Sequence, residues 1–173
     1  MNPSAYYDVT GVVVGDFMDP FVPTVAMNVY FGNHRLINSS ELRLSLAQIT
    51  PRVVIGGEHD GLYTLVMINP DAPNPNEPSL REFVVWIVTN ISSGASSDLG
   101  TEFVPYDVPN PEVGVQRYVM LLYKQKSVLN RIEPLQSRAC FKSCDFADQH
   151  NLGKPVGISY FYVRRQTRKN ARA

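Results

Sequence analysis

The chain has 173 residues, a length that suits one domain with a single core and is short for two. Hydrophobic residues make up 44% of it and charged residues 18%, which predicts a folded domain rather than a disordered one. Lys and Arg (16) balance Asp and Glu (16), so the chain lacks the positive field with which nucleic-acid-binding proteins attract phosphates. We therefore expect no direct binding of nucleic acid.

No part of the sequence has the character of a membrane segment. Residues 1–7 contain no basic stretch followed by an apolar run, and no segment has the roughly 20 apolar residues that a bilayer span needs. We expect a soluble, intracellular protein without a membrane span.

Short apolar runs, separated by Gly, Pro, Ser and Asn, predict a series of β-strands. The first run, residues 24–31, alternates apolar and polar side chains and ends at a Gly-Asn turn signal. The remaining strands are expected at residues 52–55, 62–68, 83–91, 117–123 and 156–163. The prolines lie mainly between these runs, where a missing N–H breaks no ladder. The pattern predicts an all-β-dominated domain with long irregular loops.

One short helix is expected near the C-terminus. Ser143 is the predicted cap, and Gly153 followed by Pro155 supplies the stop signal. We expect a single domain over residues 1–163 and a basic tail over residues 164–173. The tail carries Arg164, Arg165, Arg168, Lys169 and Arg172. It is interpreted as mobile and solvated, and a role in nuclear entry or in binding acidic surfaces is the alternative.

The two cysteines, Cys140 and Cys144, lie four residues apart, without a second Cys or His cluster that would complete a metal site. We predict free thiols and no metal, because a disulfide at this spacing on a helix would need unusual geometry.

Four segments carry a resemblance to a known family. They are Asn69-Pro70-Asp71-Ala72-Pro73, Arg81-Glu82-Phe83-Val84-Val85-Trp86, Gly114-Val115-Gln116-Arg117-Tyr118 and Asn151-Leu152-Gly153-Lys154-Pro155-Val156. In this order they resemble the Asp-Pro-Asp-x-Pro, Arg-Glu-x-x-His-Trp, Gly-x-His-Arg and Leu-Gly-Leu-Pro segments of the phosphatidylethanolamine-binding protein family. Residues 134–141 are similar to the plant MOTHER OF FT type, more than to the FLOWERING LOCUS T or TERMINAL FLOWER types. The resemblance implies a central antiparallel sheet, a smaller flanking sheet, a C-terminal helix and an anion pocket at one edge.

The chain departs from the family at this pocket. The family uses two Asp and two His there, and the corresponding residues are Asn69, Asp71, Val85 and Gln116. Without imidazolium donors, a phosphate-type anion such as a phospholipid headgroup is expected to bind weakly. Asp71 would repel an anion unless Arg or Lys residues elsewhere compensate. We interpret Asn69 and Asp71 as turn-forming acceptors and Tyr118 as a packed strand residue.

The resemblance also implies a cis peptide bond between Arg81 and Glu82. Phe83 stands where plant activators of flowering carry Tyr and repressors carry His. Because Phe has neither polar group, the sign of any effect on flowering is open.

Plant members of the family act as adaptors, which bind 14-3-3 proteins and, through them, basic-leucine-zipper (bZIP) transcription factors. The resemblance implies Thr64, Ser92, Leu99 and Val128 as positions of that surface, with Thr64 kept. Ser92, Leu99 and Val128 replace a usual Pro, Phe and Arg, and the lost aromatic and arginine anchors would weaken binding. This partner, and a location in the cytoplasm and nucleus, rest on analogy with the family.

Nothing in the sequence predicts catalysis or a cofactor. The three histidines, His34, His59 and His150, lie outside catalytic motifs and are expected at the surface. There is no nucleophile elbow, Walker-type loop or His-Glu-x-x-His motif. Three functions stay open: an adaptor that regulates flowering time or seed germination, a phospholipid-headgroup or small-anion binder, and a protease or kinase inhibitor.

Overall fold

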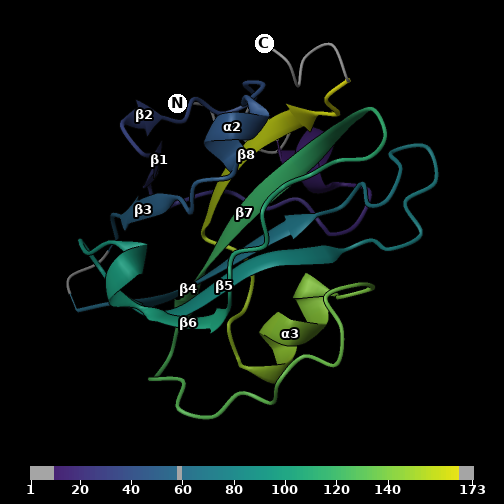
Figure 1. Ribbon diagram of the computed structural model, residues 1–173. Coiled ribbons are helices and arrows are strands. Elements are labelled where there is room, and N and C mark those ends of the chain that lie inside the picture. Colours follow the sequence, from purple (N-terminus) through teal and green to yellow (C-terminus); the bar gives the residue numbers. More distant parts are fainter. Residues whose placement is uncertain (1–9, 58–59, 168–173) are drawn as a thin grey trace.

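The computed structural model describes residues 10–57 and 60–167, which form two antiparallel sheets (Figure 1). The larger sheet has the order β6-β5-β4-β7-β8 and the smaller one the order β2-β1-β3. The larger sheet comprises β4 (Leu62–Asn69), β5 (Phe83–Ser92), β6 (Thr101–Val104), β7 (Val115–Gln125) and β8 (Gly157–Arg164). The smaller comprises β1 (Met27–Phe31), β2 (His34–Arg35) and β3 (Arg52–Ile55). The α-helices are α2 (Leu44–Ala47), α3 (Ser143–Gln149) and a short helical segment over residues 10–14, and η1 (Ser97–Leu99) is a 3-10 helix.

The larger sheet is covered on both faces, which makes its central strands apolar throughout. Alternate residues of β4 point to opposite sides, so Leu65 packs toward the small sheet and Phe31, whereas Val66 packs toward α3 and Phe146. Figure 1 shows the small sheet with α2 on one side of the large sheet and α3 on the other. The continuous apolar runs that predicted core strands therefore reflect burial on two faces.

The predicted all-β architecture with two sheets and a short C-terminal helix is confirmed, including strand 52–55 to the residue. Ser143 was expected to cap the helix, and this is wrong: it is the first residue of α3 and lies buried. Its hydroxyl donates to the Glu82 carboxylate instead of to a helical N–H. The short elements β2, β6, α2 and η1 were not predicted, because two to four residues carry too little periodicity.

The outer edge of β8 is covered by residues 38–42. The Ser39 and Leu42 N–H groups donate to the carbonyls of Tyr160 and Tyr162, at 3.2 and 2.8 Å. In return, the Tyr162 N–H donates to the Ser40 carbonyl and the Tyr160 N–H to the Asn38 side chain, at 3.0 and 3.2 Å. Every outward-facing backbone group of these two tyrosines is thus paired.

The basic segment begins inside the fold rather than after it. Arg164 is the last residue of β8, and its Nε lies 2.8 Å from Glu41 Oε1. The Arg165 N–H donates to the Gly114 carbonyl, so the expected boundary at residue 164 lies too early. The other cations of the predicted tail, Arg168, Lys169 and Arg172, and also His59, lie outside the described residues.

The prediction of free thiols is confirmed. Cys140 and Cys144 are free thiols. No described helix is long and apolar enough to cross a membrane. No group of His, Cys, Asp and Glu side chains suited to a metal ion is found among the same residues.

Candidate functional site

A cavity of about 430 Å³ lies at the edge of the large sheet where β4 ends and β5 and β7 begin. Antiparallel pairing brings these three ends together, and Asn69 lies opposite Phe83 in the β4–β5 ladder. The cavity is lined by Asn69, Ala72, Pro73, Leu80, Phe83, Val85, Asp107, Val108, Pro109, Asn110, Pro111, Glu112, Gln116 and Tyr118. Four of the five predicted pocket residues therefore meet here, together with the predicted specificity position Phe83.

The amide groups of Asn69 and Gln116 are paired with each other and with the backbone. Asn69 Nδ2 donates to Gln116 Oε1 at 2.8 Å, and Asn69 Oδ1 accepts from the Asp71 N–H at 2.9 Å. Gln116 Nε2 donates to the carbonyls of Pro73 and Val113, at 2.9 and 3.0 Å. Both N–H bonds of Gln116 are thereby used, so it holds the loops together and has no donor left for a ligand.

The floor of the cavity is apolar. Val85 and Tyr118 are 2% and 3% exposed, and the Tyr118 ring stacks on Phe161 at a centroid distance of 5.5 Å. Burial raises the pKa of Tyr118, so its hydroxyl stays protonated at neutral pH. Tyr118 is the packed strand residue that we predicted, and it also lines the cavity.

Asp71 is not among the residues that line the cavity, contrary to the prediction, because its carboxylate belongs to an ion-pair network with Arg117 and Arg81. Its carboxylate accepts from the Arg117 N–H at 2.7 Å and from Arg117 Nη2 at 2.6 Å. Arg81 Nη2 lies 3.9 Å from Asp71 and 3.1 Å from Asp16. Arg117 and Arg81 therefore supply the compensating cations that the sequence analysis left open for Asp71.

Arg117 is the centre of this network. It also contacts Asp16 through Nη2 at 2.7 Å and the Val13 carbonyl through Nη1 at 2.9 Å. Hydrogen bonds from Arg117 lower the pKa of Asp16. Although burial opposes it, pairing with Asp16 and Asp71 raises the pKa of Arg117, so the guanidinium keeps its charge. The network thus ties the N-terminal segment to β7 and to the loop after β4.

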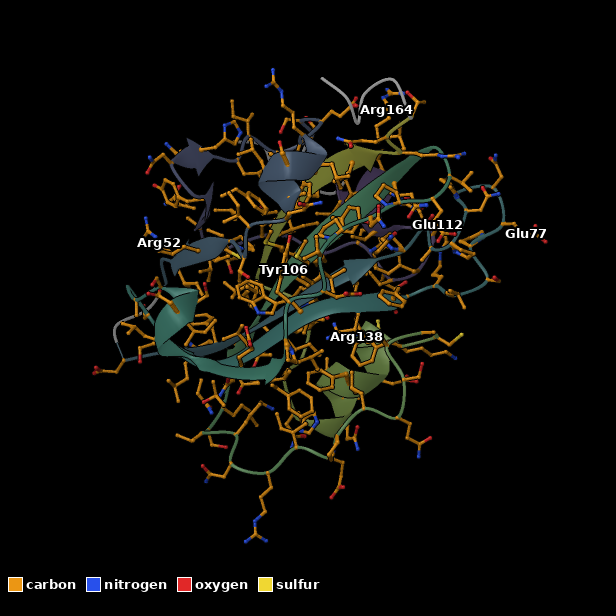
Figure 2. The ribbon with its side chains drawn as sticks, in the orientation of Figure 1. Arg52, Glu77, Tyr106, Glu112, Arg138 and Arg164 are labelled. Atoms are coloured by element: carbon orange, nitrogen blue, oxygen red, sulfur yellow. The ribbon has the colours of Figure 1, made fainter. Side chains whose placement is uncertain are left out.

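The charged groups around the cavity are acidic. Asp107 and Glu112 contribute carboxylates, and no Lys, Arg or His of the described chain lines it. In Figure 2, Glu112 lies in the loops at this edge of the sheet, near Glu77. An anion would meet carboxylates, acceptors and an apolar floor, whereas a group that donates hydrogen bonds would be favoured.

The loops that shape the cavity are held by buried polar contacts. The Arg81–Glu82 peptide is cis, as the resemblance implied, and a second cis bond joins Ala72 to Pro73. Glu82 is buried, and one of its carboxylate oxygens accepts from the Ser143 N–H at 3.0 Å. Desolvation raises the pKa of Glu82, and the Ser143 hydrogen bonds oppose that shift. This carboxylate joins the start of β5 to the start of α3.

Arg138 fastens the segment before α3 to β5. Its Nη1 donates to the carbonyls of Val84 and Val85, at 3.2 and 3.1 Å, and its Nη2 donates to Pro105 at 2.8 Å. It lies between the large sheet and α3 in Figure 2. Residues 134–141, which carried the subgroup resemblance, therefore help to position Val85 and the loop that follows β6.

Comparison with known proteins agrees with this architecture. Residues 38–161 match the family model described as phosphatidylethanolamine-binding protein. The chain belongs to the phosphatidylethanolamine-binding protein family. Protein MOTHER of FT and TFL1 homolog 2 from Oryza sativa subsp. japonica is 41% identical over 91% of this chain and 92% of its own. Protein TERMINAL FLOWER 1 from Arabidopsis thaliana is 40% identical over 92% and 90%.

Solved structures show the same fold at lower identity. A carboxypeptidase Y inhibitor, solved in complex with its cognate proteinase, has a TM-score of 0.79 at 21% identity and covers 94% of both chains. A phosphatidylethanolamine-binding protein from Plasmodium vivax has a TM-score of 0.69 at 24% identity, over 83% of this chain and 87% of that one. At these identities the likeness establishes a common fold. The predicted membership of the family's plant branch, near the MOTHER OF FT type, is confirmed by the plant relatives.

The four residues that the family resemblance assigned to a partner surface do not share one surface. Thr64 is fully buried in β4, and its hydroxyl donates to Gln125 Oε1 at 2.7 Å, so it is not available to a partner protein. Ser92 is exposed at the end of β5, and the side chains of Leu99 and Val128 are 76% and 53% exposed. These three lie at the end of the sheet away from the cavity, because β5 and β7 both run from the cavity toward it.

Sequence reasoning missed the residues that organise the site electrostatically. Arg117 belongs to the segment of residues 114–118, but no role was predicted for it. A charged residue in an otherwise apolar strand is itself a sign of a buried ion pair. Asp107 and Glu112 lie in a Pro-rich stretch that was interpreted only as a loop. Their position at the cavity depends on how that loop folds back, which no local pattern indicates.

Proposed function

We propose that this protein is a non-catalytic developmental regulator that acts as a protein-binding adaptor in transcriptional complexes. The observation that carries the proposal is its identity of about 40%, over nine tenths of the chain, to plant proteins named for floral development. Protein BROTHER of FT and TFL 1 from Arabidopsis thaliana, 37% identical over 92% of this chain, adds to them. The process is flowering time or seed germination, and the sites of action are the cytoplasm and nucleus.

The chemistry of the cavity supports a role without catalysis. The amide of Gln116 is fully used in structural hydrogen bonds, and Asp71 is held by Arg117. Hydrolysis would need an activated nucleophile beside a base, and the described lining of the cavity contains no Ser, Cys, Lys or His. A carboxylate pair at the rim, Asp107 and Glu112, also argues against a phosphate or phospholipid headgroup as the natural ligand.

We propose 14-3-3 proteins as the direct partner and bZIP transcription factors as the partners reached through them. The candidate contact surface, which we call the distal patch, consists of Ser92, Leu99 and Val128. Its support is that Leu99 and Val128 are 76% and 53% exposed, and that both lie, with the exposed Ser92, toward the end of the large sheet away from the cavity. Thr64 is not part of the distal patch, because it is buried.

A pull-down with a purified plant 14-3-3 protein tests the proposal, with a FLOWERING LOCUS T protein as the positive control. The test variant is Leu99→Asp, which places a charge in the distal patch. Ile37→Asp is the matched control, because Ile37 is 73% exposed, close to the 76% of Leu99, and lies beside the small sheet.

Capture by wild type and Ile37→Asp, with a loss of about tenfold in Leu99→Asp, is the expected result, since a charge in an apolar contact costs about 1–3 kcal/mol. Equal capture of all three proteins would remove the distal patch from the proposal. If the wild type is not captured while the positive control is, the adaptor role through 14-3-3 proteins fails.

A further inference from the structure

The cavity where β4 ends and β5 and β7 begin carries two carboxylates that the described chain leaves without an ion-pair partner. Asp107 and Glu112 line it, and both are exposed residues. None of the salt bridges between described residues includes either of them. Both therefore present a negative charge to an occupant of the cavity at neutral pH.

The nearby cations form no ion pair with these two carboxylates. Arg81 and Arg117 are matched by two carboxylates of their own, those of Asp16 and Asp71. Arg138 donates to three backbone carbonyls and does not line the cavity. Because the described lining contains no Lys, Arg or His, the charge of the cavity itself is negative.

The charge of Asp107 acts on the floor of the cavity. Burial raises the pKa of both Tyr118 and Tyr106, and the negative charge of Asp107 raises it further in each case. Tyr118 lines the cavity, and Coulomb interactions weaken with distance and with screening by solvent. The Asp107 carboxylate therefore lies close enough to the floor to act on an occupant.

The remaining lining supplies an apolar and partly aromatic surface. Phe83 and Leu80 are half-buried and line the cavity, together with several prolines. The face of an aromatic ring attracts cations as well as apolar groups. The volume of about 430 Å³ lies within the roughly 300–1,000 Å³ that small-molecule sites occupy. The cavity thus suits a molecule with a cationic end and an apolar body.

We propose that this cavity binds a small organic cation, in which an ammonium, amidinium or guanidinium group is carried on an apolar body. The cationic group pairs with the carboxylates of Asp107 and Glu112, and the apolar body packs on Phe83 and Leu80. This ligand has the opposite charge to the anion that the family resemblance implies for the same edge of the sheet. The site lies at the other end of the sheet from the distal patch, so the proposal does not rest on the adaptor function.

Benzamidinium, benzamide and benzoate are matched probes, because they share a phenyl ring with a planar head group and differ in charge. The readout is an NMR titration of the ¹⁵N-labelled wild-type protein near neutral pH. The backbone amides of Asn110 and Glu112 report on the cavity. Those of Ile37, beside the small sheet, and Leu99, in the distal patch, are the remote controls.

Benzamidinium is expected to shift the Asn110 and Glu112 amides saturably and to leave the remote amides unchanged. Benzamide should bind about tenfold more weakly, because its neutral head group forms no charge-assisted hydrogen bond. Benzoate should cause no saturable shift, because the carboxylates of the cavity repel it.

A blocked peptide, acetyl-Gly-Arg-Gly amide, distinguishes the two sources of such a cation. Tighter binding of the peptide than of benzamidinium would identify the ligand as an arginine side chain of another protein. Weaker binding of the peptide would identify it as a free small molecule.

Charge-neutralising variants connect the binding to the cavity. Asp107→Asn and Glu112→Gln should each lower the affinity for benzamidinium about threefold to fivefold, the usual range for one solvent-accessible ion pair. Glu77→Gln is the matched control, because Glu77 is exposed and lies near Glu112 in Figure 2 but does not line the cavity. Its affinity for benzamidinium should equal that of the wild type.

Equal affinity of the wild type for benzamidinium and benzamide would overturn the proposal, since charge would then play no part in binding. The absence of a saturable shift with benzamidinium would refute it as well. An equal loss in Glu77→Gln would also count against it, because the cation would then be attracted to an acidic surface and not to this cavity. The 14-3-3 pull-down uses neither these probes nor these variants, so the two proposals fail independently.

Discussion

Replacing Asp71 with Asn tests whether this residue serves the fold or a ligand. The substitution keeps the shape of the side chain and removes the charge that Arg117 Nη2 contacts at 2.6 Å. The two side chains are 6% and 14% exposed, so the guanidinium would stay mostly buried with only the more exposed Asp16 as its carboxylate partner. Breaking a buried pair on one side costs about 3–5 kcal/mol, and partial solvation reduces this to about 2–4 kcal/mol.

Urea unfolding measures this loss directly. With a slope of about 2 kcal/mol per molar urea, the midpoint of Asp71→Asn should fall by about 1–2 M without a change of slope. Glu41→Gln is the matched control, because it removes the same charge from the Glu41–Arg164 pair, whose side chains are 48% and 61% exposed. That variant should lose less than about 0.5 kcal/mol. If both variants lose equally little, the reasoning that Asp71 stabilises the loop through Arg117 is refuted.

Three further predictions concern buried or cavity side chains. Folding raises the pKa of Glu82, so the folded wild type keeps this proton to a higher pH than the unfolded chain does. The wild type therefore loses stability as the pH rises above 4.5. Glu82→Gln has no proton to lose, so its stability should rise relative to that of the wild type over this range. Urea midpoints over a pH series measure this, and a gap that does not change with pH would contradict it. Thr64→Val should lower the free energy of unfolding by about 1 kcal/mol, because the Gln125 side chain loses a hydrogen-bond donor. The variant should be captured by a 14-3-3 protein as well as the wild type is. Reduced capture of a stably folded variant would show that Thr64 belongs to the partner surface after all. The double variant Val85→His, Gln116→His should bind phosphoryl-ethanolamine about tenfold more tightly, or better, at mildly acidic pH, because two protonated imidazole rings donate charge-assisted hydrogen bonds. Calorimetry measures the affinity. A wild type that binds equally well would contradict the conclusion that the anion site is lost.

The sequence predicted the fold well because its core strands are buried on both faces. Residues 62–68 and 117–123 are apolar at nearly every position, a pattern that few alternatives to a central strand explain. The family motifs then located the loops that converge at the cavity, including the cis bond between Arg81 and Glu82. Local pattern and motif order therefore sufficed for the architecture and for the position of the site.

The direction in which polar side chains point was much harder to predict. Asp71 and Asn69 are two residues apart, yet one faces Arg117 and the other lines the cavity. That difference depends on Asp16, which lies far away in the sequence and supplies the second carboxylate for the same guanidinium. Thr64 was misassigned for a related reason, because a threonine suits both an exposed and a buried strand position, and its partner Gln125 belongs to another strand.

The covered edge of β8 determines how other chains are able to approach this protein. An open strand edge is a template on which a second chain adds a strand, which leads to swapped dimers or fibrils. At Tyr160 and Tyr162 this template is already occupied by residues 38–42, so an incoming strand would have to displace part of the protein's own chain. Recognition along this stretch must therefore proceed through side chains, and the long central sheet is kept from growing at that border.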